Sequence, residues 1–272
     1  MLKNQGSYWR KLPMSSIQSL FDDCAVDYDK TFSRTFLGGY YRSRTHRVFD
    51  KYYSGDSRIL ELNSGTGEDA IYLAESGSQV LATDLSASML NVINDKVARK
   101  ELEGKVSTRI LDLQDLDQMA GSKFDGVVSN FGGLNCINNW RKFARDAYNL
   151  MNDGGILFVC IMGPIVPWEW LWYLLQRDLA EAFRRVKGKS SWRGEDIYYP
   201  KASEFKKIVE AESFQLVYQE ALGTFMPPPY TNKHVEKWPV FYRSMSKLET
   251  FVCQSNIACH LSDHYVLVFK KC

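Results

Sequence analysis

The stretch that decides the fold begins at Arg58. It reads Arg58-Ile59-Leu60-Glu61-Leu62-Asn63-Ser64-Gly65-Thr66-Gly67-Glu68-Asp69-Ala70-Ile71-Tyr72-Leu73-Ala74. An apolar run, a glycine turn and apolar residues at helical spacing follow one another, which predicts a strand, a tight loop and a helix. A second apolar run, Val80-Leu81-Ala82-Thr83, ends at Asp84. An acid about 20 residues beyond the glycines of a βαβ unit is typical of a site that holds the ribose of a nucleoside.

Charge indicates which nucleoside the site holds. The pattern Gly65-x-Gly67-x-x-Ala70 also fits a dinucleotide site, but Glu68 and Asp69 open the helix where a pyrophosphate needs free N–H groups and positive potential. S-adenosylmethionine has no phosphate, and it carries an ammonium and a sulfonium. These two acids, together with Glu61 at the strand end, therefore favour S-adenosylmethionine over a dinucleotide.

The same residues carry a resemblance to a known family. The run from Glu61 to Gly67 resembles the first motif of the class I S-adenosylmethionine-dependent methyltransferases, in which an acid precedes a glycine loop. Asn63 stands where the family usually has its first loop glycine, and Asn tolerates a positive φ better than most residues. The resemblance implies S-adenosylmethionine as the cofactor. It also implies an α/β fold with a doubly wound, Rossmann-like, seven-stranded sheet, mostly parallel and ending in an antiparallel hairpin.

The remainder of the chain fits this order of elements. Further strands are predicted at 108–111, 124–129 and 156–162, with turns and helices between them. This alternation by itself argues for a mostly parallel sheet that is covered on both faces. The antiparallel strands are expected near 215–219 and 265–270.

The resemblance also assigns residues to the cofactor. In many members a Tyr-Asp pair ahead of the first strand closes over the methionine end, and Tyr28-Asp29 matches it. An Asp after the third strand accepts a hydrogen bond from adenine, a role that falls to Asp112. The expected cofactor-binding residues are Tyr28, Glu61, Asn63, Gly65, Gly67, Asp84, Leu85, Met89, Asp112, Leu113 and Asn130.

The end of the fourth strand bears on the acceptor. Family members that methylate exocyclic or amide nitrogens often have an Asn-Pro-Pro-Tyr motif here, whereas this chain has Asn130-Phe131-Gly132-Gly133. The difference argues against a nucleobase or a glutamine as acceptor. Because the carboxyl edge of an open α/β sheet faces the ligand crevice, we expect Phe131 to contact the substrate.

Residues 1–272 are expected to form a single methyltransferase domain with three additions. A helical lid is predicted at 16–53, and cap insertions are predicted at 163–200 and 224–260. Aromatic residues concentrate in the two insertions. With Phe131, the expected substrate-binding residues are Trp168, Trp170, Tyr199 and Tyr230. The alternative is that these rings only pack the insertions against the core.

Methyl transfer from a sulfonium needs alignment and exclusion of water more than it needs a catalytic dyad. No such dyad is evident in the sequence. If the nucleophile ionises poorly, a base would help, and the candidates are His46, Tyr41, His234 and Tyr230.

Composition sets further limits. A net charge of +2 gives no large basic field, so no nucleic-acid partner is expected. Cys259, His260 and His264 lack the spacing of a metal site, and no metal is predicted. Residues 156–175 read as a strand and a helix, not as a membrane span. The polar N-terminus lacks the pattern of a signal peptide, so a cytoplasmic protein is expected.

The sequence therefore predicts S-adenosylmethionine-dependent methyl transfer to a small, apolar or aromatic molecule. It leaves open whether oxygen, nitrogen or carbon attacks, and it leaves the oligomeric state unknown. One alternative is a nicotinamide-dependent oxidoreductase that uses the glycine loop. The other is a catalytically silent, nucleoside-binding partner subunit.

Overall fold

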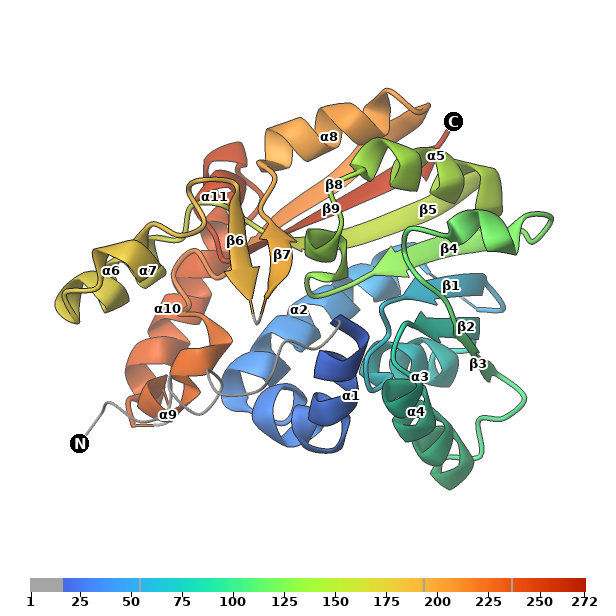
Figure 1. The fold of residues 1–272 in the computed structure, drawn as a ribbon, viewed down its shortest axis with the longest axis horizontal. Helices are drawn as coiled ribbons and strands as arrows, with labels where there is room; N and C mark the ends of the chain where they lie inside the picture. Colours follow the sequence, from blue (N-terminus) through green and yellow to red (C-terminus); the bar gives the residue numbers. More distant parts are fainter. Residues whose placement is uncertain (1–16, 54, 193, 236) are drawn as a thin grey trace.

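The computed structural model describes residues 17–53, 55–192, 194–235 and 237–272, apart from the side chains of 17–20, 23, 230, 233, 234 and 239. Its centre is a seven-stranded sheet (Figure 1). In spatial order the strands are β3 (Val106–Ile110), β2 (Gln79–Asp84), β1 (Arg58–Leu62), β4 (Phe124–Ser129), β5 (Met151–Met162), β9 (His264–Lys271) and β8 (Phe214–Leu222). The first five are parallel, and β9 is antiparallel to β5 and β8. The predicted doubly wound sheet is confirmed.

The strand order reverses at β1, which pairs with β2 on one side and with β4 on the other. In an open α/β sheet the ligand crevice lies outside the carboxyl ends of the strands at this reversal. The fold therefore places the glycine loop after β1, the acid that ends β2 and the polar end of β4 at one edge.

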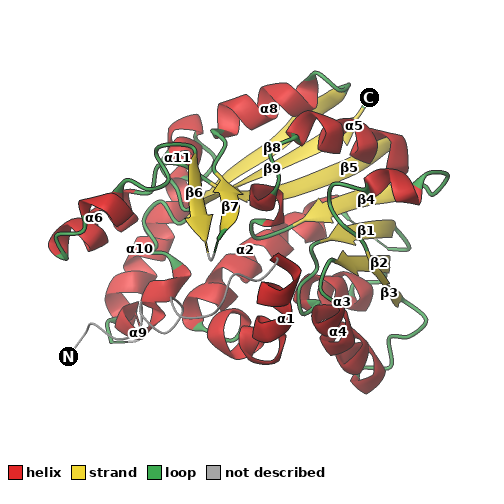
Figure 2. Cartoon of the chain, viewed as in Figure 1, coloured by secondary structure: helices red, strands yellow, loops and turns green. Residues whose placement is uncertain are grey.

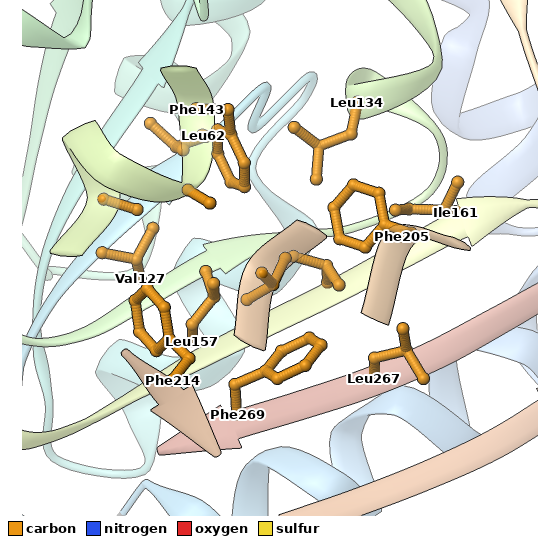
Figure 3. Packing of buried hydrophobic residues seen from close by; sticks show 14 of the residues in the cluster. Leu62, Val127, Leu134, Phe143, Leu157, Ile161, Phe205, Phe214, Leu267 and Phe269 are labelled. Atoms are coloured by element: carbon orange, nitrogen blue, oxygen red, sulfur yellow. The ribbon is translucent and has the colours of Figure 1, made fainter. Parts of the chain in front are cut away.

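Each face of the sheet is covered by helices. On one face α5 (Trp140–Leu150) and α8 (Ala202–Glu210) contribute Phe143 and Phe205 to a buried cluster with Leu157 and Phe269 (Figure 3). The other face packs against α2 (Phe36–Tyr52), α3 (Glu68–Glu75) and α4 (Ala87–Arg99). Both faces being buried explains the nearly continuous apolar runs of the central strands.

Side-chain caps fix where several helices begin. Ser86, a residue type favoured at helix N-caps, accepts a hydrogen bond from the Met89 N–H at 3.0 Å and caps α4. Asn139 caps α5 in the same way. The cap at Ser86 matters for function because it holds the start of α4 directly after Asp84.

The N-terminal segment is helical, as predicted, but it is not one regular helix. α1 (Ile17–Tyr28) runs into a π-helical turn (Asp29–Ser33), and α2 follows after a break capped by Thr35. α1 packs against α4 and lies beside the carboxyl edge of the sheet (Figure 1). Single π-helical turns are often found at functional sites.

The first insertion contains α6 (Pro167–Leu175), α7 (Leu179–Ala182) and a hairpin of β6 (Lys189–Trp192) and β7 (Glu195–Tyr198). The basic run over 177–189 predicts a helical stretch, and this prediction is wrong. The backbone is left-handed at Arg177 and Gly188, which interrupts any continuous helix, and only the short α7 forms between them.

The second insertion forms a 3-10 turn (Pro229–Thr231), α9 (Asn232–Val235), α10 (Pro239–Val252) and α11 (Asn256–His260). Two further 3-10 turns, Leu116–Met119 and Gly133–Cys136, lie in the core. Figure 2 shows the helices of both insertions and the small hairpin gathered beyond the carboxyl edge of the sheet. In the described part of the chain, no helix is both long and apolar enough to cross a membrane.

Candidate active site

The loop after β1 is left-handed at three positions. Asn63 has φ 48°, Gly65 has φ 52° and Gly67 has φ 77°. A Cβ added at Gly67 would lie 2.7 Å from the side chain of Ile93, so this glycine lets the loop pack on α4. A Cβ added at Gly65 would meet nothing within 4 Å. Gly65 therefore presents bare backbone to open space, where a ligand can approach.

Asn63 ties the end of β1 to the end of β4. Its Nδ2 donates to the Asn130 carbonyl at 2.8 Å, and its Oδ1 accepts from the Ser129 hydroxyl at 2.6 Å. Gly133 lies so close that an added Cβ would be 2.0 Å from Asn63 Cγ. The side chain that replaces the usual glycine is thus used within the protein, and only the backbone of Asn63 remains for a ligand.

Asp84 links the glycine loop to the start of α4. Its Oδ2 accepts from the Gly65 N–H at 2.9 Å, and its Oδ1 accepts from the Ser86 N–H at 2.9 Å. Burial raises the pKa of this carboxyl group. These two hydrogen bonds fix the carboxylate in place. Each of its oxygens can accept a second hydrogen bond, so the group is still able to receive two ribose hydroxyls.

Glu61 supplies a test of whether the cofactor fits. Its side chain is buried at the end of β1, and its Oε2 has no hydrogen-bond partner among the described residues. Burial and the nearby Asp69 raise the pKa of Glu61 well above its usual value. A buried carboxyl oxygen without a partner is costly. A ligand cation with N–H donors, such as the ammonium of S-adenosylmethionine, would satisfy it, so the residues present fit this cofactor.

The expected adenine side of the site lies after β3. Asp112 Oδ1 accepts from the Gln114 N–H at 2.8 Å, which fixes the carboxylate and leaves its Oδ2 available. The Leu111 N–H donates to the Asp84 carbonyl, so this loop adjoins the ribose acid. Leu85 and Leu113 are half-buried, and Met89 is buried.

Two acids of the N-terminal segment hold it on the site, and sequence reasoning missed one of them. Asp22 accepts from the Ser86 hydroxyl at 2.5 Å and from the Ser88 N–H at 3.2 Å. Asp29 accepts from the Thr66 hydroxyl at 2.5 Å and pairs with Lys96 at 2.5 Å. Asp22 and Asp29 are seven residues apart and so share one face of a helix, a spacing that could have identified Asp22.

Tyr28 lies between these two anchors along the chain. Burial raises the pKa of its hydroxyl, and Arg42 and Asp84 are close enough to influence it. The described structure thus brings Tyr28 to the same region as the ribose acid.

The acids that open α3 are both paired with cations. Glu68 bonds to Lys96 at 2.6 Å, and Asp69 pairs with Arg42 at 2.6 Å and with His46 at 2.8 Å. The repulsion of phosphate expected from these two acids is therefore weaker than the sequence suggested.

The residues proposed as a base are mostly engaged elsewhere. His46 uses its Nε2 on Asp69 and stacks on Tyr72, with ring centroids 3.7 Å apart. Tyr41 is buried, and its hydroxyl donates to the Pro227 carbonyl at 3.2 Å. The Tyr41 hydroxyl is therefore engaged within the protein, and Asp69 holds the Nε2 of His46. The side chains of His234 and Tyr230 lie outside the part of the chain that the structure describes.

Asn130 is also engaged. Its Nδ2 donates to Asp69 at 2.9 Å and to Thr45 at 3.2 Å, and its Oδ1 accepts from the Phe131 N–H. The side chain therefore orders the end of β4, and it points into the protein rather than toward a ligand.

A histidine that the sequence raised only as a metal ligand lies in the crevice. His264 begins β9, opposite Met162 at the carboxyl end of β5. Its Nδ1 lies 3.0 Å from Asp263 Oδ2, and its ring packs edge-on against Phe131 at 5.9 Å. Its Nε2 has no hydrogen-bond partner among the described residues. This arrangement is that of a histidine whose tautomer is fixed by an acid.

Asp263 is held by a buried ion-pair network. Arg185 lies 3.0 Å from Asp263 Oδ1 and 2.7 Å from Glu169, and all three side chains are buried. Burial alone would raise the pKa of Asp263, but His264 and Arg185 outweigh it and hold that pKa at about 2. Asp263 is therefore a stable carboxylate beside His264.

Phe131 and Trp168, two of the residues expected at the substrate, lie in different surroundings. Phe131 has φ 50° and packs against Phe32, with the Arg42 guanidinium 5.1 Å from its ring centre. Trp168 borders an apolar pocket of about 550 Å³ between the two insertions. This pocket is lined by Trp168 and Leu171 of α6, Thr224 and Phe225 after β8, and Ile257 and Leu261 at α11.

Two other aromatic residues expected at the substrate pack within the cap. Trp170 lies 5.4 Å from Phe183, and Tyr199 is buried beneath Arg185 and bonded to Ser190. Among the described residues, no group of three or more His, Cys, Asp and Glu side chains is arranged to hold a metal ion.

Comparison with known proteins agrees with this site. Residues 59–155 match the family model of a methyltransferase domain. The demethylmenaquinone methyltransferase of Lactiplantibacillus plantarum is 23% identical over 233 residues, which are 83% of this chain and 92% of that protein. That of Clavibacter sepedonicus is 30% identical over 146 residues, 53% of this chain and 57% of that protein. With this second relative, the similarity thus spans little more than half of either protein.

Solved structures share the fold. The cyclase SpnF has a TM-score of 0.66 and 15% identity, with 94% of each chain covered. A putative sarcosine dimethylglycine methyltransferase from Galdieria sulphuraria has a TM-score of 0.60 and 10% identity, with 92% of this chain and 98% of that chain covered. At such identities the likeness concerns the fold alone. The loop after β1, the strand-end acids and the matching family model agree, and the chain carries a class I, S-adenosylmethionine-dependent methyltransferase domain.

Proposed function

We propose that the protein transfers the methyl group of S-adenosylmethionine to a small, mainly apolar acceptor that enters between the two insertions. The observation that carries the proposal is the apolar pocket bordered by Trp168, Thr224 and Leu261. Leu261 lies two residues before Asp263 along the chain, and the Asp263 N–H faces the Gly223 carbonyl at 3.4 Å. The pocket therefore adjoins the acid that orients His264.

One polar side chain, Thr224, borders the pocket and would suit an acceptor with a polar group. Thr224 Oγ1 is buried and has no hydrogen-bond partner among the described residues. Ligand pockets are commonly apolar with a few polar atoms that fix orientation. The relatives named demethylmenaquinone methyltransferases support trying an acceptor of that chemical class here.

When bound, S-adenosylmethionine supplies an electrophilic methyl group on its sulfonium. Asp84 and Asp112 would hold its ribose and adenine, and Glu61 would receive its ammonium. Asp22 and Asp29 would keep α1 over the site as a lid. Exclusion of water by this lid and by the insertions would strengthen each polar contact within.

His264 is proposed as the general base. Its Nε2 would take the proton of the acceptor as the new bond to the methyl group forms. Asp263 would hold the Nδ1–H and stabilise the imidazolium, and Arg185 would keep Asp263 ionised. A base positioned in this way typically contributes 10²–10⁴-fold in rate.

The proposal is tested by calorimetry and a transfer assay. We expect S-adenosylhomocysteine to bind and NADH not to bind, and we expect a methylated product by mass spectrometry with a short-chain demethylmenaquinone analogue. Binding of NADH alone would favour an oxidoreductase. Binding of S-adenosylhomocysteine with no transfer to apolar hydroxyl, amine or carbon acceptors would favour a catalytically silent subunit.

A further inference from the structure

Exposed apolar side chains are concentrated in the two insertions. Of the 17 large apolar side chains that are exposed in the described part of the chain, six lie in 171–186 and six in 238–257. Leu175 is 75% exposed, Val240 75% and Phe251 87%. Scattered exposed apolar residues are ordinary, but a concentration of this kind marks an interaction surface.

These residues belong to one end of the molecule. α6 and α11 border the same apolar pocket, and the last turn of α10 contributes Val252 to it. Figure 1 shows α6, α7, α9, α10 and α11 together, beyond the carboxyl edge of the sheet. Along α10, Phe241, Leu248 and Phe251 are separated by seven and three residues and so share one exposed side. We call the exposed sides of α6, α7, α10 and α11 the cap surface.

On α10, the exposed charges of the cap surface have one sign. On α10 the exposed charged residues are Arg243 and Lys247, whereas Glu249 is buried and accepts from backbone N–H groups. On α6 the acid Glu169 is buried. Arg177 after α6 is exposed.

The two acids beside α7 are engaged within the cap. Asp178 accepts from the Glu181 N–H as the N-cap of the helix, and Glu181 pairs with Arg184 at 2.7 Å. Among the described residues of α6 and α10, no carboxylate is therefore exposed to oppose the cations.

An apolar surface with exposed cations fits an anionic lipid surface. Such surfaces insert apolar side chains into the headgroup region while Lys and Arg contact anionic headgroups. A second copy of this chain fits less well, because a symmetric interface would bring the same cations against one another.

We infer that the cap surface docks on an anionic lipid bilayer and that the apolar pocket opens onto it. Leu171 and Ile257 line the pocket and are 51% and 74% exposed, so they mark its mouth on this surface. The inference rests on the proposed function for one point only, namely that the acceptor passes from the bilayer through this mouth toward His264. The docking itself requires no methyl transfer.

The test is co-sedimentation of the full chain with phosphatidylcholine vesicles and with vesicles that also contain phosphatidylglycerol. We expect binding to the mixed vesicles, weaker binding to phosphatidylcholine alone, and loss of binding as salt increases. Val240→Glu and Phe251→Glu should each weaken binding to the mixed vesicles about tenfold, because each places a carboxylate where an apolar group enters an anionic surface.

Val26→Glu is the matched control, since Val26 is 87% exposed but lies on α1, away from the cap surface. It should bind vesicles as the wild type does. Equal binding by Val240→Glu, Phe251→Glu and wild type would overturn the inference. So would a dimer in ultracentrifugation that these two substitutions dissociate while no vesicle binding is seen, because a second copy would then cover the surface.

A parallel transfer assay with a short, water-soluble acceptor separates the two proposals. Transfer without vesicle binding would overturn the docking and leave the proposed function standing. Vesicle binding without transfer to any acceptor would support the docking and overturn the proposed function.

Discussion

Asp84 organises the site before any ligand is present. Its two oxygens accept from the N–H groups of Gly65 and Ser86, so one side chain joins the glycine loop to the start of α4. On the other side of the loop, the Asn63 side chain packs against Gly133 and joins the end of β1 to the end of β4. A bound nucleoside would therefore meet backbone and carboxylate that are already in position.

Asp84→Ala should weaken binding of S-adenosylhomocysteine by about 10²–10⁴-fold. Two charge-assisted hydrogen bonds to ribose would be lost, at about 1.5–3 kcal/mol each. The measurement is isothermal titration calorimetry. Asp115→Ala is the control, because Asp115 is exposed and bonds only within its own loop. Equal affinities of the two variants would show that the ribose lies elsewhere.

His264→Gln should lower kcat by about 10²–10⁴-fold while affinity for S-adenosylhomocysteine stays unchanged. The rising limb of the pH–rate profile should also disappear, a change that a merely structural role would not produce. His260→Gln serves as the matched control, since His260, at the end of α11, bonds to the Asn256 carbonyl and to Ser203 of α8. Unchanged kcat for His264→Gln would mean that another group, or none, takes the proton.

Some of these residues could be predicted and others could not, for physical reasons. Gly65, Gly67 and Asp84 were visible because the loop needs unusual backbone angles and a fixed spacing to the next strand. Asn63 was recognised as compatible with the loop, but its partners on β4 lie about 66 residues away and leave no local pattern. His264 was missed as a base because its place depends on the register of β9 against β5.

At the scale of elements, α1 is tied to the core through two carboxylates. Val26 and Asp27 on this helix are exposed, and its anchors are Asp22 and, just beyond its end, Asp29. Segments that cover a ligand site commonly open locally at a lower free-energy cost than the core. This is the property expected of a lid that must admit and release ligands.

Asp29→Ala should therefore loosen the lid without unfolding the core. We expect affinity for S-adenosylhomocysteine to fall about tenfold, because an ion pair with Lys96 and a hydrogen bond from Thr66 are lost. Amide hydrogen exchange in α1 should become faster. Asp27→Ala, on the exposed side of the same helix, should leave both unchanged. If exchange in α1 does not respond to Asp29→Ala, the anchor is not what holds the lid.

Trp168 and Trp170, two of the three tryptophans of α6, should separate substrate contact from packing. Trp168→Ala should raise the KM for the acceptor about tenfold with little change in Tm, because Trp168 lines the pocket. Trp170→Ala should lower stability by about 1 kcal/mol and leave KM unchanged, because its ring packs on Phe183. Thermal unfolding and steady-state kinetics measure both. The reverse pattern would place the acceptor on the other side of the helix.

The cap shows where sequence patterns cease to determine elements. The core strands were predicted because both of their faces are buried, and every one appears in the sheet within a few residues of its expected bounds. In the first insertion, charged residues over 177–189 suggested a solvated helix. Arg185 is instead buried between Glu169 and Asp263, two partners far away in the chain. Tertiary ion pairs of this kind override local helix preference.

For the whole molecule, the fold determines where the ligand site lies but not which reaction takes place there. The similar structures include one named as a cyclase and one named as a methyltransferase, so the reaction must be argued from the site. In this chain the site is completed by the cap, because Arg185 of the first insertion pairs with Glu169 and with the acid beside His264. The same network therefore joins the insertion to the sheet.

This network makes a prediction about stability and pH. The folded pKa of Asp263 is about 2, below its ordinary value of 3.8, so the group stabilises the fold when ionised. A lowered pKa means that the contribution is complete above about pH 4 and is lost as the pH falls toward 2. The shift corresponds to about 2 kcal/mol of unfolding free energy.

Urea denaturation from pH 6 to pH 2 measures this contribution. Asp263→Asn should be less stable than the wild type at pH 6, since Arg185 and His264 lose their ionised partner, and the gap should narrow toward pH 2, where the wild-type carboxylate becomes protonated. Asp196→Asn is the control, because its pair with Lys189 is exposed and solvent screens it, so the gap should be small at every pH. If the gap for Asp263→Asn were constant from pH 6 to pH 2, the carboxylate would not be the group that joins the cap to the sheet.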